Sequence, residues 1–127
     1  MGVVATLLLL SLGGCKDSSP TVVAGTYTGT ATGARNGFGF TDNITFTLAQ
    51  NGSQITGTWA SNALTSGSIT GILSGSTLNG SLTQTNCSGS LPANAQVENS
   101  GKHLSGVYSG AVCGQTVSAT FVVDRVY

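Results

Sequence analysis

Apolar and polar residues alternate along most of the chain from residue 22 onward, in short runs separated by Gly, Asn and Ser. Alternation with a period of two predicts β-strands that bury one face. No stretch has the three-to-four-residue apolar period of an amphipathic helix. We therefore expect an all-β chain with strands near residues 22–32, 41–50, 54–59, 67–73, 77–85, 89–98, 103–109 and 115–125.

Short Gly-containing and Asn-containing segments separate these runs. Asn51-Gly52, Ser74-Gly75 and Asn99-Ser100-Gly101 predict tight hairpin turns, because Gly and Asn tolerate a positive φ. The segment from Gly33 to Phe40 is expected to form the longest loop. Pro92 cannot donate a backbone hydrogen bond, so it suggests a bulge in the sixth strand.

A triplet with apolar, Gly and apolar residues at alternate positions recurs along the chain. Each triplet lies on one face of its strand, and an inward Gly lets the strand coil sharply against its neighbours. We therefore predict an eight-stranded antiparallel up-and-down β-barrel, with a β-sandwich as the alternative fold. The triplets are Val23-Gly25-Tyr27, Ile55-Gly57-Trp59, Ile69-Gly71-Leu73, Leu78-Gly80-Leu82 and Leu104-Gly106-Tyr108.

This pattern resembles the calycin architecture of lipocalins and avidins. In such a small barrel, side chains fill the interior or leave space for one small ligand. Trp59 is the only tryptophan, so the tryptophan set of avidins is absent and biotin binding is not implied.

The composition argues against several classes of partner. The 127 residues hold 4 Lys+Arg and 4 Asp+Glu, and only 6% are charged. This length corresponds to one domain. A neutral chain lacks the cationic surface that binds nucleic acid, and it lacks the polybasic attraction to anionic lipid. We expect no nucleic-acid partner, and a monomeric or weakly associating protein.

The apolar run from Val3 to Leu12 has the length of a signal-peptide core and is too short to span a bilayer. The residues that follow, Leu12-Gly13-Gly14-Cys15, resemble the lipobox of bacterial lipoproteins. The resemblance implies a signal peptide over residues 1–14 and a lipid anchor on the Cys15 thiol. With Lys16 after the cysteine, it favours the outer membrane of the bacterial envelope. The alternative is that residues 3–12 form a buried strand and Cys15 is an ordinary thiol.

The remaining chain then divides into two parts. Residues 15–22 are polar, contain Pro20, and are expected to form a tether. Residues 23–127 form the barrel domain. In an up-and-down barrel, the tether and the turns after the second, fourth and sixth strands share the membrane-proximal end. The other turns share the distal end.

Cys87 and Cys113 lie in two turns that this topology places at the distal end. In an oxidising compartment such a pair forms a disulfide, which we therefore expect. The competing hypothesis is a metal site with His103. A tetrahedral metal site needs three or four ligands, and no other histidine exists, so we expect no metal and no cofactor.

Aromatic residues suggest a site at the distal end. Tyr27, Trp59 and Tyr108 end their triplets there, and Phe38 and Phe40 belong to the long loop. These residues suit a mouth that takes a small apolar or amphipathic ligand, or a plug of packed rings. The loop suits a lid or a contact with a partner. Arg35 and Arg125 are expected to be solvated charges.

Nothing in the sequence indicates an enzyme. His103 is the only histidine, no serine is singled out by a nucleophile-elbow motif, and no two carboxylates are placed together. We expect a non-enzymatic binding module. The alternative is an envelope interaction protein that contacts another protein or a glycan through residues 38–40.

Overall fold

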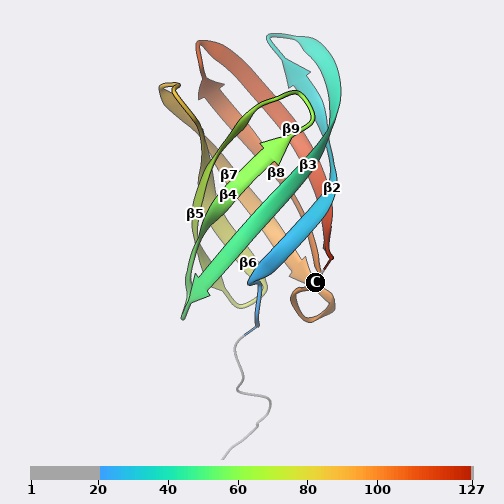
Figure 1. Cartoon of the computed structure of the whole chain (residues 1–127), viewed down its shortest axis with the longest axis vertical. Coiled ribbons are helices and arrows are strands. Elements are labelled where there is room, and N and C mark those ends of the chain that lie inside the picture. Colours follow the sequence, from blue (N-terminus) through green and yellow to red (C-terminus); the bar gives the residue numbers. More distant parts are fainter. Residues whose placement is uncertain (1–20, 127) are drawn as a thin grey trace, which may run out of the picture.

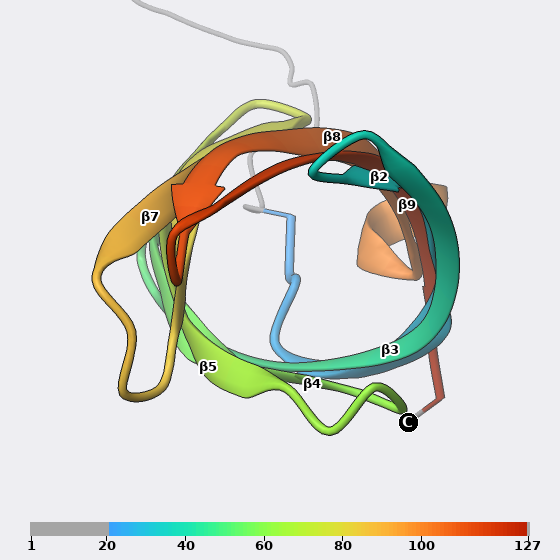
Figure 2. The ribbon, with the colours of Figure 1, turned by 90° about the horizontal axis from the view of Figure 1, so that it is seen from above.

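The computed structural model describes residues 21–126, which fold into one closed barrel of eight antiparallel strands (Figure 1). Each strand pairs with its neighbours in sequence, and β2 pairs with β9 to close the ring (Figure 2). The predicted up-and-down barrel is confirmed, and the sandwich alternative is wrong. The strands are β2 (Gly25–Arg35), β3 (Phe38–Asn51), β4 (Gln54–Ser61), β5 (Ser66–Ser74), β6 (Thr77–Gln84), β7 (Gly89–Glu98), β8 (His103–Val112) and β9 (Gln115–Arg125).

The two ends of the barrel differ in what they contain. At the proximal end β2 begins and β9 ends, and the β3–β4, β5–β6 and β7–β8 connections lie there (Figure 1). The last of these is a short 3₁₀ turn over Asn99–Gly101. The other four connections lie at the distal end. Among the described residues, no helix is long and apolar enough to cross a membrane.

The first hairpin differs most from its prediction. The segment from Gly33 to Phe40 is not a long loop, since β2 continues to Arg35 and β3 starts at Phe38. The turn is Asn36-Gly37, with φ of 51° and 84°. A two-residue turn with both φ angles positive matches the right-handed twist of the flanking strands. Phe38 and Phe40 therefore belong to a strand.

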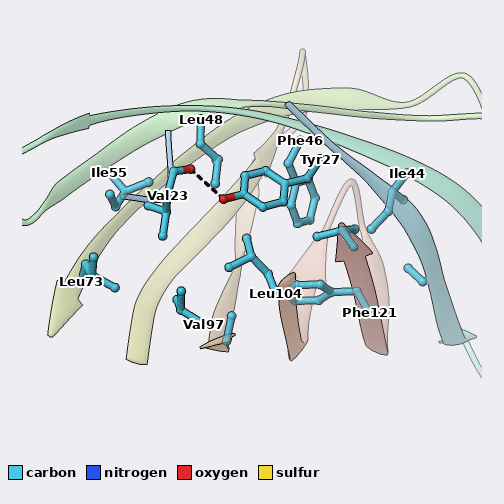
Figure 3. Packing of buried hydrophobic residues seen from close by; sticks show 13 residues of the cluster. Val23, Tyr27, Ile44, Phe46, Leu48, Ile55, Leu73, Val97, Leu104 and Phe121 are labelled. Atoms are coloured by element: carbon cyan, nitrogen blue, oxygen red, sulfur yellow. Dashed lines mark hydrogen bonds between the residues drawn. The ribbon is translucent and has the colours of Figure 1, made fainter. Parts of the chain in front are cut away.

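Alternate residues of each strand point into the barrel and form its core (Figure 3). Phe46 and Phe121 meet edge to face, with ring centroids 5.4 Å apart. Tyr108 stacks on Phe121 with centroids 6.1 Å apart. Burial of these apolar side chains is the main stabilising contribution to the fold.

The inward glycines stand where neighbouring strands approach too closely for a side chain. A Cβ atom on Gly29 would lie 1.9 Å from the carbonyl oxygen of Val122, and one on Gly80 would lie 2.0 Å from that of Thr70. Both distances are far below van der Waals contact. The recurring glycine therefore permits the tight coiling that closes a small barrel.

Pro92 interrupts the β7–β8 ladder without making a bulge. Ser90 pairs with Ala111 and Ala93 pairs with Tyr108, so the register is the same on both sides of the proline. The expected bulge is therefore wrong. The proline removes a backbone donor, and no extra residue enters the strand.

Candidate functional site

Tyr27 lies near the proximal end, not at the distal mouth as expected. It is the third residue of β2, which begins at that end, and it is fully buried. Its hydroxyl group donates toward the carbonyl oxygens of Val23 and Gly101, at 3.1 and 2.5 Å. Burial raises the pKa of Tyr27, and the nearby Arg125 guanidinium partly opposes that rise. Tyr27 is thus a structural residue of the closed end.

The segment that precedes β2 seals this end. Val23 is completely buried among the core residues. The side chain of Gln50 accepts a hydrogen bond from the Val23 amide at 2.8 Å and donates one to the Thr21 carbonyl at 2.9 Å. Arg125 donates to the Ala24 carbonyl at 3.2 Å, so it is not simply a solvated charge. Ligand entry from this end would require displacing the chain itself.

The distal half of the barrel holds a small cavity lined by Trp59, Leu82 and Tyr108 among others. The structure thus brings together two of the three aromatic residues expected at a mouth. The cavity volume is about 30 Å³. A second, almost wholly apolar cavity of about 40 Å³ adjoins Phe46, Ile69 and Leu104. Pockets for drug-sized ligands measure roughly 300–1,000 Å³, so side chains largely fill this interior.

An ion pair lies across the distal mouth. A guanidinium nitrogen of Arg35 is 3.5 Å from a carboxylate oxygen of Asp42, and the Arg35 guanidinium carbon is 4.4 Å from the centre of the Phe40 ring. Burial raises the pKa of Tyr108 nearby, and the Asp42 charge adds to this rise while Arg35 opposes it. Arg35 was expected to be a solvated charge. Instead it pairs with Asp42 and lies over the Phe40 ring, above the apolar interior.

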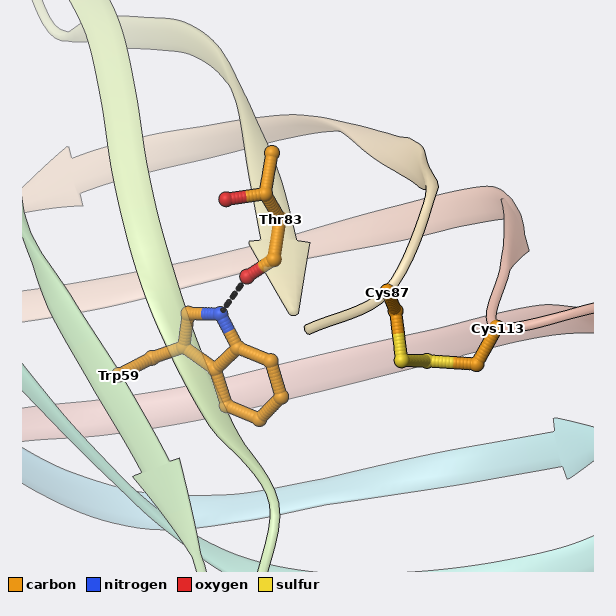
Figure 4. The surroundings of a disulfide bond; sticks show 4 residues. All are labelled: Trp59, Thr83, Cys87 and Cys113. Carbon is orange, nitrogen blue, oxygen red and sulfur yellow. Dashed lines mark hydrogen bonds between the residues drawn. A yellow bond between two sulfur atoms is a disulfide. The ribbon is translucent and has the colours of Figure 1, made fainter. Parts of the chain in front are cut away.

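Trp59 of β4 is held in place by a hydrogen bond that reaches across β5 to β6. Its indole N–H donates to the carbonyl oxygen of Thr83 at 2.8 Å (Figure 4). Gly67 leaves room for this contact, since a Cβ atom there would lie 2.7 Å from the indole nitrogen. The ring therefore packs as part of the wall, although one side of it faces the distal cavity.

The predicted disulfide is present at the same end (Figure 4). Cys87 and Cys113 are joined with their Cα atoms 4.8 Å apart, between the β6–β7 and β8–β9 turns. This pairing agrees with the topology from which it was predicted. The disulfide ties two distal turns together and fixes one side of the rim.

The rim exposes two large apolar side chains. Phe38, the first residue of β3, is 78% exposed, and Leu64 in the β4–β5 turn is 96% exposed. Leu64 has a φ of 64°, a backbone conformation that is uncommon for leucine. The Asn62 amide donates to the Asn43 carbonyl at 3.0 Å, and the Asn43 amide donates to the Asn62 side-chain oxygen at 2.9 Å. These two bonds hold the turn against β3. Phe40 differs from Phe38, because it is partly buried against the core.

The titratable residues in the described part of the chain form no recognisable catalytic group. His103 lies at the proximal end, where its Nδ1 atom is 2.6 Å from Asp124 and its Nε2 atom is 3.6 Å from Glu98. Neither contact includes a serine or cysteine nucleophile. Within residues 21–126, no cluster of three or more His, Cys, Asp or Glu side chains has an arrangement that could hold a metal ion.

Comparison with models of known protein families gives no match, and comparison with curated proteins gives none either. The geometry of the barrel and the sequence of its N-terminal segment are therefore what bear on its function.

Proposed function

We propose that the chain is a non-enzymatic lipoprotein of the bacterial envelope that recognises another protein through its distal rim. The observation that carries the proposal is the exposure of Phe38 and Leu64 at the end opposite the entry of the N-terminal segment. Phe38 borders the β2–β3 turn and Leu64 lies in the β4–β5 turn, and large apolar side chains exposed at one end of a molecule are found at interaction surfaces. The disulfide and the docked β4–β5 turn hold that rim in shape.

The anchor belongs to the proposal as well. Cys15 lies outside the described residues, and Thr21 is the first described residue, at the proximal end. The intervening residues 16–20 place Thr21 at most about 20 Å from Cys15 along an extended chain. A lipid on Cys15 would hold the proximal end near the bilayer, and the rim would project away from it. The proposed outer-membrane location rests on Lys16, the residue after the cysteine.

The rim is tested by co-purification from detergent-solubilised envelopes after chemical cross-linking. We expect the wild-type chain to retain a specific protein that the double variant Phe38→Ser/Leu64→Ser loses. The matched control is Val107→Ser/Val122→Ser, which removes apolar side chains that are 50% and 46% exposed on the wall. Identical protein partners for the rim variant and the wild type would contradict the proposal.

The anchor is tested separately by labelling cells with a clickable fatty acid. The wild-type chain should carry the label and sediment with membranes. Cys15→Ala should lose the label and leave the membrane fraction. An unlabelled wild-type chain would contradict the lipoprotein proposal, whatever the result at the rim.

A small amphipathic ligand at the distal mouth is the second candidate function. Arg35, Asp42 and Tyr108 converge there above apolar side chains, an arrangement that suits a polar head group. A cavity of about 30 Å³ leaves little room for an apolar tail unless the mouth opens. Titration of fatty acids against Trp59 fluorescence tests this candidate. A saturable spectral shift would support it, and an unchanged spectrum would count against it.

A further inference from the structure

The outer wall carries a hollow much larger than the two interior cavities described above. This hollow has a volume of about 650 Å³ and extends over β4, β5 and β6 to the edge of β7. The side chains that line it and point outward include Gln54, Thr56, Thr70, Ile72, Asn79 and Pro92. It lies on the side of the molecule, so it is distinct from the distal rim.

Two glycines lie in the part of the wall beneath the hollow. Gly71 and Gly80 are paired across β5 and β6, and both line the hollow. A Cβ atom on Gly80 would lie 2.8 Å from the Cα atom of Gly71, so the two backbones pack without intervening side chains. The same two residues also line the inner apolar cavity. Both glycines belong to inward-facing triplets, so the space left by their missing side chains lies on the inner face of the wall. The hollow itself is bounded by the outward side chains around them.

The hollow contains no charge. None of its lining residues is ionisable. The charged side chains of the described residues lie toward the two ends of the barrel, as the Arg35–Asp42 pair and the group around His103 illustrate. The hollow therefore offers no ionic attraction to phosphate, carboxylate or sulfate groups.

The lining instead supplies neutral hydrogen-bonding groups. The amides of Gln54 and Asn79 and the hydroxyl groups of Thr56 and Thr70 can each donate and accept. A hydrogen bond from the amide of Asn94 fixes the orientation of the Asn79 side chain. Amides and hydroxyls in a shallow, exposed hollow match a ligand whose own surface is rich in hydroxyl groups.

We propose that this hollow binds an uncharged oligosaccharide. The polar lining would bond to sugar hydroxyls, while Ile72, which is 51% exposed, and Pro92 would pack against the apolar C–H faces of the sugar rings. The hollow is wide and open to solvent, with a volume of about 650 Å³, so a bound sugar chain would lie along the wall. The proposal is independent of the protein partner assigned to the rim.

The test is isothermal titration of the purified full chain, in a non-glycosidic detergent, with chitohexaose and maltohexaose. An acidic oligogalacturonate of similar length is the charged comparison. We expect saturable binding of at least one neutral hexasaccharide, with an affinity that varies little with salt. The oligogalacturonate should not bind. Failure of both neutral sugars to bind at millimolar concentration would overturn the proposal.

Matched variants locate the binding. Thr70→Arg places a long cation in the hollow and should weaken sugar binding at least tenfold. Thr30→Arg makes the same change at an exposed outer position of β2 and should leave binding unchanged. The rim variant Phe38→Ser/Leu64→Ser should also bind normally. Equal losses in the two arginine variants, or loss in the rim variant alone, would contradict a site on this wall.

Discussion

Inward glycines let adjacent strands of this barrel come closer than any side chain would allow. A Cβ atom on Gly29 would lie 1.9 Å from the Val122 carbonyl oxygen, and one on Gly106 would lie 2.1 Å from the Asn94 carbonyl oxygen. The conflict is with backbone atoms, which cannot rotate away as a flexible side chain can. A methyl group at such a position must separate two strands or distort their hydrogen bonds.

Gly29→Ala is therefore expected to lower the free energy of unfolding by about 2 kcal/mol or more, as overpacking of a dense interior does. Gly39→Ala is the matched control, since the nearest atom to its Cβ would be 3.8 Å away. The control should change the free energy of unfolding by less than about 0.5 kcal/mol. Urea denaturation followed by Trp59 fluorescence measures both. Equal stability of the two variants would contradict the close-packing account.

Two tyrosines make stability fall at alkaline pH. Burial raises the pKa of Tyr27 and of Tyr108, so the folded chain holds these protons at a pH where the unfolded chain has lost them. The unfolded state then binds fewer protons, and the free energy of unfolding decreases as the pH rises above about 10. Denaturation at a series of pH values should show this decline. In the variant Tyr27→Phe/Tyr108→Phe, the free energy of unfolding should decline less steeply with pH. A decline as steep as that of the wild type would show that the two buried tyrosines do not cause it.

At the scale of the elements, alternation and turn residues were enough to predict most of the barrel. The bounds predicted for β7 and β9 are those observed, because clear turn residues flank both strands. The first hairpin was mispredicted because several glycines around Asn36-Gly37 hid a two-residue turn. That Asn-Gly pair is itself a strong hairpin signal, and it could have identified the turn.

The mispredicted hairpin also explains most errors at the candidate site. The sequence predicted that this strand ends at residue 32, which placed Tyr27 near the distal end. The strand in fact continues to Arg35, so Arg35 lies at the distal end and Tyr27 does not. Continuing the alternation through the turn would have put Arg35 and Asp42 on the same inner face. The exposure of Leu64 depends on how its turn docks on Asn43, which no local pattern reveals.

The two distal turns joined by Cys87 and Cys113 should lose stability together when the disulfide is removed. The cysteines are 26 residues apart, and closing a loop of that length stabilises a fold by about 3 kcal/mol. Cys87→Ala/Cys113→Ala should therefore unfold at a lower urea concentration, and a reducing agent should shift the wild type in the same direction. A wild-type unfolding curve unaffected by reduction would contradict a structural role for this disulfide.

At the scale of the whole molecule, closure gives the barrel its distinct surfaces. One end is sealed by Val23 and its hydrogen-bonded neighbours, and the other exposes an apolar rim. The wall between them carries threonine, serine and asparagine with few charges. An uncharged sheet with open edges would associate through its unpaired backbone groups, and pairing β2 with β9 removes those edges. The rim and the outer hollow both depend on this closure.

Residue-resolved amide hydrogen exchange tests the closure most directly. If β2 and β9 pair as in the register of Thr30 with Val122, their hydrogen-bonded amides should exchange as slowly as those between β5 and β6. Both sets should open only with global unfolding. Fast exchange confined to the facing amides of β2 and β9 would show an open sheet and would contradict the account.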